Sequence, residues 1–214
     1  MAATDAELYA RWTEGEREAG DELLARHLPR VRRFFAYKVT ARSDAEDLVG
    51  KTLEVCAKTL GRARPDAPFT TFLFAVARNV LRDYIKARSR RANKEVDDID
   101  VLALADLGPS PSVVVAEREE QRLLLEALRS IPLNYQIVLE LAYFEGMSRS
   151  EIAQLLDRPQ GTVASQLRLG RTRLDQSLMA LADSQEVLES TMTDLAMWAR
   201  ALRTSLDAGQ EQHA

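Results

Sequence analysis

The sequence is poor in the side chains that form disulfides and metal sites. Its 214 residues include a single cysteine, Cys56, and two histidines, His27 and His213, that lie far apart. One cysteine cannot form an internal disulfide, and two distant histidines lack the spacing of zinc ligands. We therefore expect no disulfide framework, no metal site and no cofactor.

Long apolar segments and catalytic motifs are missing as well. No stretch approaches the ~18–20 consecutive apolar residues that span a bilayer, and residues 1–8 lack the basic flank and apolar run of a signal peptide. No nucleophile, paired carboxylate or phosphate-binding loop stands out. These absences predict a cytoplasmic protein with no membrane segment, no catalytic residue and no enzymatic activity.

Strand-forming residues are also scarce. Aromatic residues make up 6% of the chain and glycine occurs nine times, while alanine, leucine, glutamate and arginine are common, a composition that favours helices. Residues 43–46 and 148–151 fit the capping box that begins many helices. Helical periodicity extends over residues 5–40, 44–60, 69–90, 116–130, 133–145, 149–156 and 162–182. The predicted fold class is all-α.

Charge is distributed unevenly along the chain. The net charge is −4, which at face value argues against a nucleic-acid partner. Residues 26–91, however, carry 16 basic and 6 acidic side chains, whereas residues 1–25 and 92–120 are acidic. This concentration of positive charge in one block indicates a nucleic-acid-binding surface.

Residues 92–117 predict a linker between two helical domains. They combine an acidic run with the sequence Gly-Pro-Ser-Pro, whose prolines are incompatible with a continuous helix. We therefore divide the chain into two small helical domains, residues 1–91 and 118–182, which this acidic linker joins. A C-terminal extension, residues 183–214, follows them.

The second domain contains a helix-turn-helix pattern. Residues 148–157 form a short amphipathic helix, a turn follows, and a second helix begins at Thr162. Val163, Leu167 and Leu174 form the buried stripe of the second helix, which leaves polar and basic side chains exposed for base edges and phosphates. Periodicity alone leaves open a plain helical hairpin with a solvated face.

The first domain ends in a helix with a basic flank. Over residues 69–91, apolar side chains form a core stripe, while Arg78, Arg82, Lys86 and Arg90 recur every four residues. Such a row suits a phosphate backbone, although a solvated charged face is the usual alternative. The lack of compensating acids at i,i+4 spacing favours contact with nucleic acid.

Two sets of motifs resemble one family. Residues 43–53 (SDAEDLVGKTL) and 69–79 (FTTFLFAVARN) resemble region 2 of the extracytoplasmic-function (ECF) sigma factors of bacterial RNA polymerase. Residues 128–141, 145–156 and 161–174 resemble region 4 of bacterial sigma factors. The sequence departs from the family pattern at Gly50, Lys51, Phe72, Ala164, Gln166, Leu169 and Gly170.

The resemblance implies a promoter-specificity subunit that binds core RNA polymerase, through the β′ clamp helices and the β flap, and promoter DNA. The implied contacts with the β′ clamp helices are Asp44, Glu46, Asp47 and Leu48. The implied contacts with the minus-ten element, including a loop that receives a flipped-out base, are Arg62, Arg64, Arg78, Asn79, Arg82, Asp83, Lys86 and Arg90. The implied contacts with the minus-thirty-five element are Ser148, Arg149, Thr162, Ser165, Gln166, Arg168, Arg171 and Arg173.

The C-terminal extension has a regular seam. From Leu174 to Leu206, seam positions alternate spacings of four and three, and Trp198 flanks them. The pattern predicts an amphipathic helix over residues 184–207, either continuous with the preceding helix or restarted at a capping box at 183–186. Three partners for its apolar face stay open: the chain's own domains, a second copy, and a regulatory partner such as an anti-sigma factor.

A one-component transcription regulator with a similar helix-turn-helix is the alternative function. Regulators of that kind share the Glu-Ile-Ala and Thr-Val patterns of residues 151–153 and 162–163. They lack the stretch from Asp44 to Asn79, so the sequence favours the sigma factor.

Overall fold

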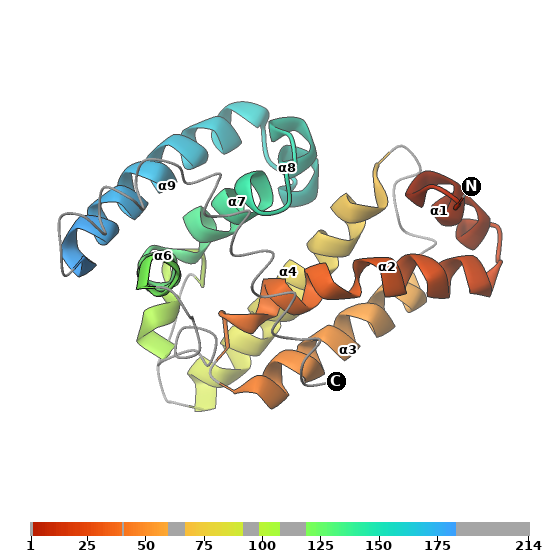
Figure 1. Ribbon diagram of the computed structural model, residues 1–214, viewed down its shortest axis with the longest axis horizontal. Coiled ribbons are helices and arrows are strands. Elements are labelled where there is room, and N and C mark those ends of the chain that lie inside the picture. The colour runs from red at the N-terminus through yellow and green to blue at the C-terminus, as the bar shows by residue number, and fades with distance from the viewer. Residues whose placement is uncertain (1, 40, 60–66, 92–98, 108–118, 183–214) are drawn as a thin grey trace.

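The computed structural model describes residues 2–39, 41–59, 67–91, 99–107 and 119–182. Within these ranges the chain forms α-helices and short 3-10 helices, with no strands. Figure 1 shows two groups of helices, α1 to α4 in red to yellow and α6 to α9 in green to blue. The all-α prediction is confirmed. None of the helices in these ranges combines the length and apolar character needed to cross a membrane.

A turn separates the first two helices, α1 (Asp5–Thr13) and α2 (Arg17–Ala36). Gly15, in this turn, has a φ of 102°, a left-handed conformation that glycine adopts without a side-chain clash. The prediction of helical structure throughout residues 5–40 is therefore wrong at this point. Periodicity did not detect the turn because apolar residues recur on both sides of it.

Capping boxes begin two of the helices. At α8 (Arg149–Leu156), the Ser148 hydroxyl accepts the Glu151 N–H, and the Glu151 carboxylate accepts the Ser148 N–H at 2.7 Å. Thr4 and Glu7 form the same reciprocal pair before α1. The box predicted at Ser148 is confirmed, and the one at Thr4 was not anticipated.

Helices α3 (Arg42–Thr59) and α4 (Phe69–Arg91) pack together beside α2. The capping box predicted at Ser43 is wrong, because α3 begins at Arg42 and includes Ser43 in its first turn. Helix α4 buries more than the single apolar stripe predicted from the sequence, because α3 and α8 both pack against it. Its additional buried residues are Phe74, Ala77, Leu81 and Ile85.

The linker, residues 92–117, is packed against both domains in its described part. Two 3-10 turns, η2 (Ile99–Val101) and η3 (Leu104–Leu107), contact helices of the first and second domains. Ile99 and Leu104 are 2% and 0% exposed and belong to the hydrophobic core. Because burial of apolar surface stabilises this arrangement, residues 99–107 are held against both domains.

The second domain contains the helix-turn-helix. In the described residues its helices are α6 (Glu119–Ser130), α7 (Leu133–Tyr143), α8 (Arg149–Leu156) and α9 (Gln160–Leu181). Asp157 follows the last residue of α8, and its φ of 51° places it in the left-handed region. Helix α9 then begins at Gln160, two residues before the predicted start at Thr162.

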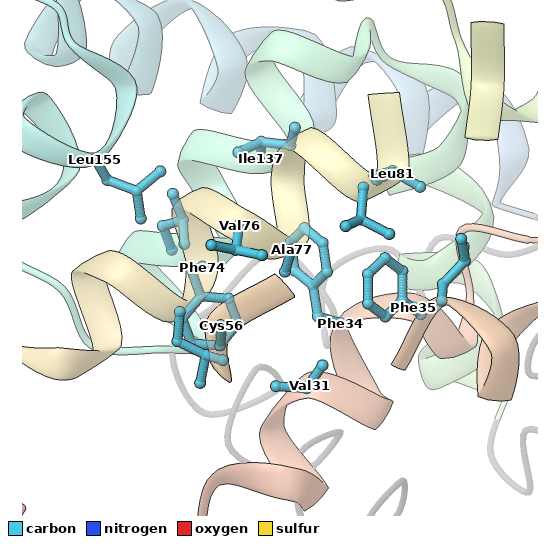
Figure 2. Packing of buried hydrophobic residues seen from close by; sticks show 14 of the residues in the cluster. Val31, Phe34, Phe35, Cys56, Phe74, Val76, Ala77, Leu81, Ile137 and Leu155 are labelled. Carbon is cyan, nitrogen blue, oxygen red and sulfur yellow. The ribbon is translucent and has the colours of Figure 1, made fainter. Parts of the chain in front are cut away.

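One hydrophobic core crosses the boundary between the two domains. Figure 2 shows core side chains of α2 and α4, among them Phe34 and Val76, together with Ile137 of α7 and Leu155 of α8. A second cluster lies between α6, α7 and α9 and also includes Tyr37, the residue that follows α2. The shared core holds the two domains in a closed arrangement, with α8 packed against α4.

Candidate nucleic-acid interface

The basic row on α4 divides into two parts. Lys86 and Arg90 are exposed. The Arg78 and Arg82 side chains are only 16% and 24% exposed, and both form ion pairs with Asp100 of the linker. No acid pairs with these arginines at i,i+4 spacing along α4, and the linker supplies their acidic partner instead.

The structure describes only some of the other residues predicted to contact the minus-ten element. Asn79 and Asp83 are exposed on α4, beside the basic row. Arg62 and Arg64, predicted to line the loop before α4, lie outside the described residues. The structure therefore places the helical part of the predicted minus-ten surface and leaves its loop as a prediction.

Asp100 contacts arginines from both domains. Arg158 Nη2, in the turn of the helix-turn-helix, lies 3.0 Å from Asp100 Oδ2. From α4, Arg78 Nη2 lies 3.7 Å from Oδ1, and Arg82 Nη1 donates to the same oxygen. Sequence analysis missed Asp100 and Arg158. The only local signal was an aspartate directly after a core isoleucine, which does not reveal its partners.

Helix α9 separates a buried face from an exposed one. Val163 and Leu174 are fully buried, whereas Thr162, Ser165 and Arg168 are exposed. The predicted orientation of these residues is confirmed. The exposed residues occupy the first turns of the helix, the part that a recognition helix presents to the major groove.

Three predicted residues of α9 have internal contacts. Gln166 is 9% exposed, because it follows Val163 by three positions and shares the packed face. Arg171 Nε donates to Asp175 at 2.9 Å, and the Arg173 guanidinium lies 5.1 Å from the centre of the Tyr135 ring. Gln166 therefore does not belong to the exposed surface.

The start of α8 supplies two further predicted residues. Ser148 is exposed, but its side chain is engaged in the capping box with Glu151. Arg149 is exposed and follows it directly. Both lie on the same helix-turn-helix unit as the exposed residues of α9.

The acidic cluster of α3 is partly internal. Glu46 and Asp47 are exposed, and Asp44 accepts a hydrogen bond from the Tyr84 hydroxyl at 2.7 Å. Leu48 is 7% exposed and belongs to the core. It therefore stabilises the domain and is not available as the surface contact that the resemblance implied.

Ion pairs join α2 and the residues just after it to the second domain. The Glu145 carboxylate contacts Arg30 Nε at 2.6 Å and Arg33 Nη2 at 3.1 Å, and Lys38 Nζ lies 2.6 Å from Glu140 Oε2. Burial lowers the pKa of Lys38 and raises the pKa of Glu140, against their mutual attraction. Sequence analysis missed these pairs, whose members at Glu145 lie 112 and 115 positions apart.

Comparison with known proteins decides the family. The model described as Sigma-70 region 2 matches residues 23–91, and the one described as Sigma-70, region 4 matches residues 121–174. The chain belongs to the sigma-70 family. The matched segments fall within the two helical domains and together span more than half of this sigma factor.

Its relatives support the resemblance to ECF sigma factors. The ECF RNA polymerase sigma-E factor of Salmonella typhimurium is 26% identical over 185 residues, covering 83% of this chain and 96% of that protein. The RNA polymerase sigma-H factor of Pseudomonas aeruginosa is 26% identical over 184 residues, covering 83% of this chain and 95% of that protein.

Solved structures show the same fold. CnrH, solved in complex with the cytosolic domain of CnrY, is 25% identical with a TM-score of 0.58, over 83% of this chain and 99% of that one. The sigma factor RpoE of Bartonella quintana, solved with the anti-sigma factor NepR, is 19% identical with a TM-score of 0.58, over 76% of this chain and 98% of that one. At that identity, the second match supports the fold alone.

Proposed function

We propose that this sigma factor binds core RNA polymerase and directs transcription from promoters with particular minus-ten and minus-thirty-five elements. The observation that carries the proposal is that one chain has two surfaces suited to binding DNA. They are the basic row of α4 and the exposed face of α9. Each lies on a domain that matches a sigma-70 region. The protein's role is recognition and positioning, without a catalytic centre of its own.

Helix α9 would read the upstream element. Thr162, Ser165 and Arg168 are exposed along its first turns, where a recognition helix meets base edges. Arg168 has the paired donors that bind O6 and N7 of guanine. Arg149, at the start of α8, suits a phosphate contact that fixes the register of the helix on DNA.

Helix α4 would bind the downstream element. Arg78, Arg82, Lys86 and Arg90 form a row at four-residue spacing that can follow the phosphates of one strand. Asn79 and Asp83 lie beside this row with exposed polar side chains suited to base edges. Arg62 and Arg64, in the predicted loop before α4, would contact a flipped-out base.

The acidic residues of α3 would contact polymerase. Glu46 and Asp47 are exposed, and Tyr84 positions the carboxylate of Asp44. This surface complements a basic coiled coil such as the β′ clamp helices, and charge complementarity accelerates association. The second domain would contact the β flap.

An anti-sigma factor is the proposed regulatory partner. The structurally similar CnrH was solved with a protein partner bound, the cytosolic domain of CnrY. Residues 184–207, predicted to form an amphipathic helix, lie outside the described residues. Their binding to such a partner, or to the chain's own domains, stays a proposal.

Transcription with purified core polymerase tests the proposed function. We expect the protein to copurify with core enzyme and to select a pair of spaced elements from a randomised promoter library. Promoter selection by the isolated protein, with no association with core enzyme, would instead support the one-component regulator. No copurification and no transcript would contradict the sigma function.

Salt dependence tests the role of α4. Replacing Arg78, Arg82 and Lys86 with alanine should weaken promoter binding by the holoenzyme and reduce the slope of log K against log salt by about one for each lost phosphate contact. A matched variant with alanine at Arg17, Lys58 and Arg122 loses the same charge elsewhere and should keep the slope. Equal slopes in the two variants would show that the α4 row is a solvated face.

A further inference from the structure

We propose that Asp100 is an autoinhibitory clamp whose carboxylate occupies a phosphate-binding position of α4 and must leave before α4 binds promoter DNA. The inhibitory role rests on the proposed promoter binding. The clamp itself is a contact between the linker and two domains, and it can be measured without DNA or polymerase.

The Asp100 site has the composition of a phosphate site. Three guanidinium groups, from Arg78, Arg82 and Arg158, converge on a single carboxylate. The four side chains are between 14% and 30% exposed, so water screens these charges less than it screens surface pairs. Arginine forks bind carboxylates and phosphates with the same donor geometry. The carboxylate of Asp100 thus holds the place of a phosphate oxygen pair.

Among the described residues, positive groups outnumber negative groups at this site. One carboxylate contacts three guanidinium groups. Burial lowers the pKa of Arg78, the attraction of Asp100 opposes this, and repulsion by Arg82 and Arg158 lowers the pKa further. A DNA strand offers successive phosphates and releases counterions on binding, so it satisfies these arginines more completely than Asp100 does.

The backbone around Asp100 is fixed, which distinguishes the clamp from a chance surface contact. Ile99, its neighbour in η2, is 2% exposed in the core between the domains. The carbonyl of Leu102 accepts a hydrogen bond from Leu133 N–H at 2.9 Å, at the start of α7. The carbonyl of Leu104 accepts one from Arg129 Nη2 at 3.0 Å. The linker therefore holds Asp100 in place from both sides.

The clamp opposes DNA binding in two ways. Asp100 engages Arg78 and Arg82, the N-terminal half of the α4 row, so that their guanidinium groups are not available to phosphates. Through Arg158, it also ties the helix-turn-helix to α4, which α8 already covers. Promoter elements read by α4 and α9 lie apart on DNA, so the two units must separate to bind both.

The first test measures the distance between the two domains, which reports directly whether they are closed. Spin labels at Glu18→Cys on α2 and Gln176→Cys on α9, both exposed positions, report the distance between the domains. The native Cys56 does not compete for the label, because it is fully buried and burial raises its pKa to about 12. Asp100→Asn keeps the size of the side chain and removes its charge.

We expect Asp100→Asn to raise the open population about threefold to tenfold, the range for losing a partly buried charged contact. Asp106→Asn, an exposed acid of the same linker, changes the net charge equally and should leave the distances unchanged. Arg158→Gln, which removes the positive partner of Asp100 on the second domain, should also open the domains. Distances unchanged by both Asp100→Asn and Arg158→Gln would overturn the clamp.

The second test measures inhibition. Holoenzyme with Asp100→Asn should bind a selected promoter about threefold to tenfold more tightly than wild type at low salt, while Asp106→Asn should match wild type. An equal gain in both variants would reflect net charge alone and would overturn the inhibitory role. Failure of every protein, wild type included, to bind any promoter would contradict the proposed function, and the label distances would still decide whether Asp100 closes the two domains.

Discussion

His27 is buried where α1, α2 and α4 meet, and its neighbours determine its charge. Its Nε2 lies 2.7 Å from Asp5 Oδ2, and its Nδ1 lies 3.2 Å from Arg30 Nη1. Because a guanidinium only donates, Nδ1 accepts, and the ring is the neutral tautomer with its proton on Nε2. Burial lowers the pKa of His27, and the hydrogen bond with Asp5 opposes this only in part.

We expect the free energy of unfolding to decrease as the pH falls below 6.5, the ordinary pKa of the histidine. The folded pKa is lowered, so the unfolded chain takes up the proton first, and the loss is complete below the folded pKa. Urea unfolding at about pH 7.5 and about pH 5.5 measures this change. His27→Gln, which does not titrate, should show a smaller decrease, and an equal decrease in both proteins would contradict the assignment.

Arg168 is the exposed basic residue of α9 that we expect to contact a base. Arg168→Ala should weaken binding to the upstream element by about 1–3 kcal/mol and relax the preference at one position. Arg168→Lys keeps the charge but loses the paired donors, so it should lose the same preference and keep most of the non-specific affinity. Holoenzyme binding to a set of single-substitution duplexes measures both effects. Uniform weakening on every duplex would assign Arg168 to the phosphate backbone.

Helices α1 and α2 approach closely because one position between them has no side chain. A Cβ atom at Gly20 would lie 2.5 Å from Cε2 of the Trp12 ring, closer than real Cβ contacts. The ring is 9% exposed and packs edge-on to Phe69 at 6.0 Å between centres. Gly20 is therefore needed for packing. Gly50, by contrast, lies in α3 with no atom within 4 Å of its Cβ position.

This difference predicts opposite effects of the same substitution. Gly20→Ala should lower the free energy of unfolding by about 1–3 kcal/mol, because the Trp12 ring or the helix must move. Gly50→Ala should raise it by up to about 1 kcal/mol, because alanine favours the helix and meets no obstacle. Urea unfolding of the two variants measures both values. Stabilisation by both substitutions would show that α1 adjusts freely.

The closed arrangement of the two domains combines a shared apolar core with buried charges. Lys38 and Glu140 are 0% and 1% exposed, and their atoms lie 2.6 Å apart. The Lys38 ammonium also lies 3.9 Å from the centre of the Phe34 ring and 4.1 Å from that of Tyr37. Such a pair favours this docking of the domains, because a docking that buried only one of the two charges would leave it without a partner.

Removing one member of this pair should therefore cost more than removing both. Lys38→Met or Glu140→Leu alone should lower the free energy of unfolding by about 3–5 kcal/mol, since each leaves a buried charge unpaired. The double variant should recover most of this loss, because apolar side chains replace both charges. Denaturant unfolding of the four proteins measures the coupling energy. Additive effects would show that the two residues act separately.

The local sequence pattern by itself determines several features of this protein. Periodicity and composition predict an all-α chain, the two-faced helix α9 and the capping box at Ser148, because each depends on residues within one or two turns. The motifs around Asp44 and Asn79 indicate the family. Gly15 is not predicted by this pattern, because its φ of 102° divides a stretch whose apolar periodicity continues on both sides.

Only the tertiary structure decided which predicted site residues are available and what holds them. Leu48 and Gln166 belong to packed faces because neighbouring helices cover them, and neighbours across space have no local signature. The contacts of Asp100 with Arg82 and Arg158 span 18 and 58 positions in the sequence. Because charge attraction and apolar burial act between atoms that are close in space, only the packing of the two domains brings these residues together.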